Sequence, residues 1–250
     1  MPISAEAPWL NYYGAIPRTL NYPRLTIYQL VAQTARECPD LPAYEFMGRR
    51  TSYRDFLARI DRAALALYTA GIRAGDRVTI CMPNTPQALD YALNRIGAVS
   101  NMIHPLSAEE EIRFYLDVSG SQAILTLDRF YGKVAAAAAR AKRKPKLWIA
   151  RLQPELKPLM RLGYNLTQGR KTPKLPQEGY TLWTDLLRKA AGTLPPDDGQ
   201  CDACASILYS GGTTGTTKGI CLSSYNFNAL ALQTIAASGY ESIRGCTMLS

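Results

Sequence analysis

Between residues 53 and 127 the chain alternates helix-type and strand-type patterns three times. Helical spacing of apolar residues covers 53–70, 86–96 and 108–118, and short apolar runs typical of strands cover 77–81, 99–103 and 123–127. Such alternation predicts parallel strands joined by right-handed helical crossovers. Ser107 followed by Glu110 indicates a capping box at the start of the third helix. A further helix at 133–142 and a strand at 146–150 extend the pattern. We therefore expect an α/β fold with a mostly parallel sheet and flanking helices.

The rest of the chain divides around this unit. Residues 1–50 form an N-terminal extension with a helix at 26–38 and a hairpin turning at Met47-Gly48, and residues 51–150 form the α/β subdomain. Residues 151–200 are a basic insert or linker that contains six prolines, with one helix expected near 182–190. Residues 201–250 begin a second subdomain, with a helix capped by Ser223 or Ser224 that runs to about Ser238 and a strand at 247–249.

A glycine- and hydroxyl-rich loop lies between two strand-like runs, 205–209 and 219–222. It reads Ser210, Gly211, Gly212, Thr213, Thr214, Gly215, Thr216, Thr217, Lys218, Gly219. The glycines allow the backbone to approach a ligand closely, and successive N–H groups and hydroxyls in such a turn donate to an anion. Lys218 adds a mobile positive charge. The composition predicts a polyphosphate-binding loop, against the alternative of an ordinary flexible connection.

The spacing excludes a P-loop of the Walker type. That motif needs glycine directly before the lysine and a helix directly after it. Here Thr217 precedes Lys218, Gly219 follows it, and the loop joins a strand to a strand.

The loop resembles the signature of the adenylate-forming enzymes, T-S-G-T-T-G-x-P-K-G. It departs from that signature at Ser210, Gly211 and Thr217, which stand in place of threonine, serine and proline. Other segments resemble the same family in the same order, so that the likeness covers most of residues 25–250. They are 51–56, 70–80, 82–86, 97–99, 104–110 and 117–126. Within the family, the chain is most similar to long-chain fatty acyl-CoA synthetases.

The resemblance implies attack of a carboxylic acid, most simply a fatty acid, on the α-phosphate of ATP, followed by transfer of the acyl group from the adenylate to the thiol of CoA. Residues 210–219 would hold the β- and γ-phosphates, Lys218 would act as the catalytic residue that stabilises departing pyrophosphate, and Mg²⁺ would share that task. No residue of the chain is assigned as a metal ligand. Three alternatives stay open: an amino, aryl or bile acid as substrate, a non-catalytic nucleotide- or membrane-binding module, and a basic nucleic-acid binder.

Enzymes of this family are about twice as long as the 250 residues of this chain. Their second half carries a Y-G-x-T-E motif, a ribose-binding aspartate and a lysine needed for adenylation, none of which has a counterpart here. The resemblance therefore implies the N-terminal portion of such an enzyme, with the adenine and CoA sites largely outside it. We expect residues 1–250 alone to lack ligase activity.

The positive charge of the chain is concentrated in one segment. Residues 140–174 contain eleven Lys or Arg against one acid, a net +10, whereas the whole chain carries +9. Leucines interleave with these cations. The segment either lies peripherally on an anionic membrane surface or forms a solvated loop over an apolar groove. Because the charge is local and no nucleic-acid motif is present, we expect no nucleic-acid partner.

Composition and single residues narrow the remaining functions. No apolar run reaches ~18 residues, and residues 1–9 lack the features of a secretion signal. We therefore expect a cytoplasmic protein whose six cysteines are free thiols. If residues 140–174 lie on a membrane, we expect that contact at the inner face of the membrane. Cys201-Asp-Ala-Cys204 is a single C-x-x-C without a second pair, which disfavours structural zinc. His104, the only histidine, stands at no catalytic spacing.

Overall fold

The computed structural model describes residues 8–87, 89–167, 169, 172–210 and 217–239. Its helices are α1 Ile27–Glu37, α2 Tyr53–Thr69, α3 Leu89–Arg95, α4 Glu109–Ser119, α5 Tyr131–Arg140, α6 Pro158–Leu166, α7 Trp183–Lys189 and α8 Ser224–Ser238. Short 3-10 helices cover Pro8–Tyr12, Asp128–Phe130 and Gln153–Glu155. The strands are β1 Pro42–Phe46, β2 Arg49–Ser52, β3 Arg77–Cys81, β4 Val99–Met102, β5 Ala123–Leu127, β6 Lys146–Ala150, β7 Thr181–Leu182, β8 Cys204–Ser210 and β9 Lys218–Ser223.

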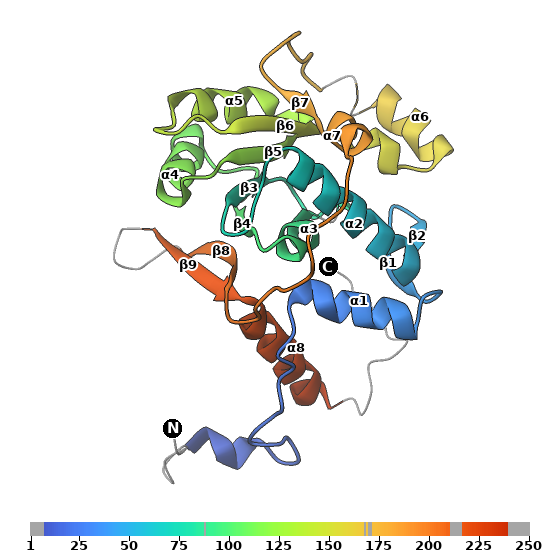
Figure 1. Ribbon diagram of the computed structural model, residues 1–250, viewed down its shortest axis with the longest axis vertical. Coiled ribbons are helices and arrows are strands. Elements are labelled where there is room, and N and C mark those ends of the chain that lie inside the picture. Colours follow the sequence, from blue (N-terminus) through green and yellow to red (C-terminus); the bar gives the residue numbers. More distant parts are fainter. Residues whose placement is uncertain (1–7, 88, 168, 170–171, 211–216, 240–250) are drawn as a thin grey trace.

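The described strands form a small hairpin and one large sheet (Figure 1). The hairpin pairs β1 with β2, and the large sheet has the order β7-β6-β5-β3-β4-β8-β9. All neighbours in it are parallel except β9, which is antiparallel to β8. The expected α/β architecture with a mostly parallel sheet is therefore confirmed. The order reverses at β3, which has β4 on one side and β5 on the other, and such a switch point opens a crevice at the carboxyl ends of parallel strands.

Two hydrophobic clusters sandwich the sheet. Along β5, Leu125 and Leu127 join the cluster formed with α1, α2, α3 and α7, whereas Ile124 joins the cluster formed with α4 and α5. All five residues of β5 are buried, which is why its sequence is a continuous apolar run and does not alternate. Helices therefore cover both faces of the central strands.

Hydroxyl side chains cap three of the helices, and the predicted cap at Ser223 is confirmed. Thr26 caps α1 with a capping box to Gln29, and Ser52 and Ser223 cap α2 and α8. The box predicted from Ser107 and Glu110 is wrong. Helix α4 begins one residue later, Ala108 occupies the cap position, and the Ala108 N–H donates to Glu111 Oε2 at 2.8 Å. Three consecutive glutamates allow this shift, because Glu111 accepts from the N–H of Ala108 as Glu110 would have accepted from that of Ser107.

Residues 151–200 contain one helix more than the sequence predicted. Besides α7, the structure places α6 at Pro158–Leu166, where Pro158 occupies the first turn and a 3-10 turn precedes it. Proline needs no hydrogen-bond partner for its nitrogen in the first turn, so it starts this helix instead of breaking it.

Candidate phosphate-binding hairpin

The end of the β8–β9 hairpin holds the described part of the candidate loop. Strand β8 ends at Ser210 and β9 begins at Lys218, and these two residues form the last pair of the antiparallel ladder. The predicted strand–loop–strand setting is thus confirmed. Thr217 and Gly219 flank Lys218, whereas Gly211, Gly212, Thr213, Thr214, Gly215 and Thr216 lie outside the described residues. The structure brings Ser210, Thr217, Lys218 and Gly219 together at one end of the hairpin.

Lys218 is exposed, and no hydrogen bond or ion pair engages its ammonium group within the described part of the chain. Its neighbours across the ladder and along the strand are the hydroxyl-bearing residues Ser210 and Thr217. An unpaired ammonium beside hydroxyl donors is suited to phosphate oxygens, which accept hydrogen bonds and carry negative charge. These residues therefore fit a polyphosphate.

A buried polar network ties this hairpin to the sheet core. The Tyr209 hydroxyl donates to Asn101 Oδ1 at 2.7 Å, and Asn101 Nδ2 donates to Thr79 Oγ1 at 2.8 Å and to Ser119 Oγ at 3.1 Å. The Tyr209 ring also stacks on Tyr115 with centroids 4.2 Å apart. The network spans β3, β4, α4 and β8, so the residue directly before Ser210 is fixed to four elements.

Sequence reasoning missed these supporting residues. A signal was present: Thr79 and Asn101 are polar residues within buried parallel strands, where a polar side chain needs a partner. Burial also raises the pKa of the Tyr209 phenol to about 12, so the hydroxyl stays protonated and keeps its donor role over the physiological range.

Gly219 has a steric reason to lack a side chain. A Cβ added there would meet Ile207 Cγ2 and Tyr209 Cε1, each at 3.3 Å. Both are tighter than ordinary contacts, and Tyr209 is held by its hydrogen bond. The glycine after the lysine thus lets β9 lie close to β8.

A cleft of about 530 Å³ opens beside β3 and β4, where both strands end next to the switch point. Ile80, Met82 and Met102 contribute apolar surface from the strands, and the β1–β2 hairpin and α3 close it. Asp90 lines it and accepts a hydrogen bond from Ser100 Oγ. Burial raises the pKa of the Asp90 carboxyl, with the Ser100 bond opposing the rise. The cleft is large enough for a small ligand with an apolar part.

Other residues singled out in the sequence form no site. His104 is exposed, and its Nδ1 accepts from the Leu106 N–H at 3.2 Å. Cys201 and Cys204 are free thiols, as are the other described cysteines, Cys38, Cys81 and Cys221. Among the described residues, no three His, Cys, Asp or Glu side chains gather as metal ligands.

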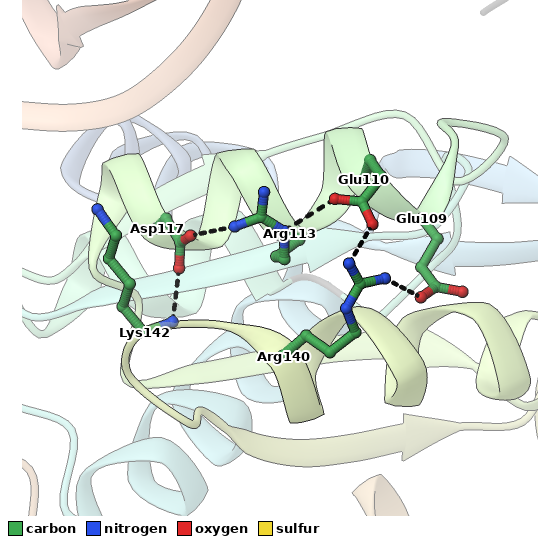
Figure 2. Close-up of polar contacts among 6 residues, drawn as sticks. All are labelled: Glu109, Glu110, Arg113, Asp117, Arg140 and Lys142. Carbon is green, nitrogen blue, oxygen red and sulfur yellow. Dashed lines mark hydrogen bonds and ion pairs between the residues drawn. The ribbon is translucent and has the colours of Figure 1, made fainter.

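The basic segment 140–174 does not lie on one surface. Strand β6 separates Arg140–Lys144, before its first residue, from Arg151 and α6 beyond its last, and Figure 1 shows α5 and α6 at opposite sides of the molecule. Near α5 the charge is partly neutralised (Figure 2): Arg140 bonds to Glu109 at 3.0 Å and Glu110 at 2.5 Å. Asp117 accepts from the Lys142 N–H at 2.7 Å and from Arg113 at 2.8 Å. Within the described residues, the cations of the segment are therefore divided between the two ends of β6.

Two solved structures of CoA ligases share the fold of this chain. An anthranilate–CoA ligase crystallised with anthranoyl-AMP superposes with a TM-score of 0.69 at 17% identity, over 85% of this chain and 37% of that one. A benzoate–CoA ligase from Burkholderia xenovorans LB400 gives 0.64 at 19% identity, over 83% and 36%. At these identities the likeness establishes the fold.

Residues 31–248 match the AMP-binding enzyme family, so the chain belongs to that family. A long-chain-fatty-acid–CoA ligase of Bacillus subtilis (strain 168) is 28% identical over 244 residues, which are 91% of this chain and 42% of that protein. The chain thus spans about two-fifths of the length of this relative. The resemblance read from residues 209–219 and the ordered segments before them is confirmed.

Proposed function

We propose that the chain binds the polyphosphate of ATP and serves the activation of a carboxylic acid as an acyl-adenylate, from which an acyl-CoA thioester is formed. The observation that carries this is the β8–β9 hairpin, which is anchored by Tyr209. Its end presents Lys218, which has no partner among the described residues, beside Ser210 and Thr217. Membership of the AMP-binding enzyme family supports the same chemistry.

In this proposal the residues of the chain position the phosphates of ATP and neutralise their negative charge. The ammonium of Lys218 lies next to the β- and γ-phosphate oxygens and stabilises the charge that develops on departing pyrophosphate. The hydroxyls of Ser210 and Thr217, with residues 211–216 between them, donate to the same oxygens. Mg²⁺ bound with the nucleotide would supply further neutralisation of the phosphate charge, and the anchored hairpin keeps the donors in place.

A fatty acid is the substrate we favour, because the B. subtilis relative is named for long-chain fatty acids. The structures of anthranilate and benzoate ligases keep an aryl acid as the alternative. Because residues 1–250 alone are expected to be inactive, the two are separated by calorimetric binding of palmitate and of benzoate to residues 1–250 in the presence of ATP.

A test of the loop needs only nucleotide binding. We expect Lys218→Ala to weaken binding of a fluorescent ATP analogue to residues 1–250 by about tenfold or more, because a charge-assisted contact is lost. Lys189→Ala, another exposed lysine, is the matched control. Unchanged affinity in Lys218→Ala would contradict the proposed role. If residues 1–250 bind ATP but catalyse no acid-dependent pyrophosphate exchange, they bind the nucleotide without carrying out the adenylation reaction.

We also propose that α6 contacts an anionic membrane surface. Leu159, Leu162 and Leu166 share one face of this helix and are 81%, 58% and 54% exposed. Lys157 and Arg161 lie on the same segment and supply charge complementary to anionic headgroups. None of the described helices is long and apolar enough to span a bilayer. Leu162→Ser should reduce cosedimentation with phosphatidylglycerol vesicles, whereas Leu230→Ser, an exposed leucine on α8, should not.

A further inference from the structure

A second cavity, of about 550 Å³, lies between the β1–β2 hairpin, α2 and α7. Four arginines line it, and we call it the arginine pocket: Arg49 and Arg50 from β2, Arg59 and Arg62 from α2. None of them belongs to the β8–β9 hairpin. The acids in its lining are Asp55 and Glu155. The lining therefore carries an excess of positive charge.

Two of these arginines already have partners. Arg59 Nη1 bonds to Glu155 Oε2 at 2.9 Å in a largely buried pair, and Arg50 Nε bonds to Glu45 Oε2 at 2.7 Å. Arg49 and Arg62 make no hydrogen bond or ion pair within the described residues. Lys157 adds charge at the hairpin, because its Nζ lies 3.6 Å from the position of a Cβ added at Gly48. The free guanidinium groups favour an anionic ligand, and phosphate matches their forked geometry.

A polar group in the lining needs a hydrogen-bond donor. Gln87 is only 7% exposed, and its Oε1 has no hydrogen-bond partner among the described residues. A buried acceptor without a donor is unfavourable. Trp183 and Leu187 supply an apolar wall to the same pocket. The lining thus combines free cations, an acceptor that lacks its donor, and an apolar surface.

We propose that the arginine pocket binds a phosphomonoester of a hydroxylated organic molecule. Arg49 and Arg62 bind the phosphate, Gln87 Oε1 accepts from a hydroxyl group, and the carbon skeleton packs on Trp183. The phosphomonoester can be free in solution or the headgroup of a lipid. The lipid source has a structural argument, because Lys157 directly precedes the exposed leucines of α6. This site is independent of the proposed ATP site.

The test measures binding of glycerol 3-phosphate and inorganic phosphate to residues 1–250 by calorimetry. We expect Arg62→Gln and Arg49→Gln each to weaken glycerol 3-phosphate binding by about tenfold. Arg54→Gln is the matched control, because Arg54 is on the same helix but pairs with Asp40 at 2.8 Å outside the pocket. Gln87→Leu should weaken glycerol 3-phosphate but leave inorganic phosphate unchanged, which a purely electrostatic patch would not show.

Vesicles distinguish the two sources. Phosphatidic acid carries a phosphomonoester, whereas phosphatidylglycerol at equal surface charge carries a diester. The lipid headgroup is the ligand if the protein prefers phosphatidic acid, loses this preference in Arg62→Gln, and does not bind glycerol 3-phosphate. Binding of glycerol 3-phosphate that is lost in the pocket variants assigns a free ligand. Phosphate binding that is lost in Lys218→Ala but kept in both arginine variants overturns the proposal, as does an absence of binding to every one of these ligands.

Discussion

The central strands and the β8–β9 hairpin belong to one sheet but are built differently. Every residue of β5 is buried between helices, whereas the first four residues of β9 are exposed. The central strands obtain their stability from apolar contacts on two faces. The hairpin depends on its pairing with β4 and on the hydrogen bonds of Tyr209. This difference separates a buried platform from the exposed strand β9 at its edge.

The largest expected effect comes from the platform. Leu125 is fully buried in β5, so Leu125→Ala removes apolar contacts and leaves a cavity. We expect a loss of about 2–5 kcal/mol in the free energy of unfolding, measured by urea denaturation. A loss below ~1 kcal/mol would show that the platform relaxes easily and would weaken the comparison.

The second largest loss of stability is expected from the hydrogen bond between Asn101 and Tyr209, which links the two regions. Asn101→Ala leaves the Tyr209 hydroxyl and Thr79 without their amide partner, and we expect a loss of about 1–3 kcal/mol. Tyr209→Phe removes only the hydroxyl. In a double-mutant cycle the two changes should be non-additive, because both break the same hydrogen bond. Additive losses would mean that the network does not couple the hairpin to the core.

The sequence predicted an element well where its residue pattern was compatible with only one kind of secondary structure. The buried strands 77–81, 123–127 and 146–150 were predicted to the residue, because continuous apolar runs bounded by turns leave little choice. The strand–loop–strand setting of the candidate loop was predicted from the flanking apolar runs. The α4 cap was misplaced because neighbouring glutamates compete for it, and α6 was missed because Pro158 was taken as a helix breaker. The Tyr209–Asn101 contact and the arginine pocket join residues far apart in sequence, which no local pattern reports.

Alkaline pH should destabilise both the hairpin and the platform, because each contains a tyrosine hydroxyl with a raised pKa. Burial raises the pKa of Tyr209 to about 12, above the ~10 of an unfolded tyrosine. The protonated phenol therefore contributes stability that is complete below pH ~10 and is lost as the pH rises toward 12. Tyr28, which is hydrogen-bonded to Asp61, has a similarly raised pKa of about 12. Denaturation from pH 9 to 12 should show a shallower loss in Tyr209→Phe, and a shallower one again when Tyr28→Phe is added.

The smallest effect is expected at the exposed face of β9. Ile220 is 45% exposed, so Ile220→Ala loses few contacts and should change stability by no more than ~0.5 kcal/mol. It is the counterpart of Leu125→Ala, since both are aliphatic truncations in strands of one sheet. Lys218 and its neighbours should then bind ATP analogues with unchanged affinity in Ile220→Ala. A large stability loss at Ile220 would mean that this face of β9 is covered in solution, and that the hairpin is as much a part of the core as β5.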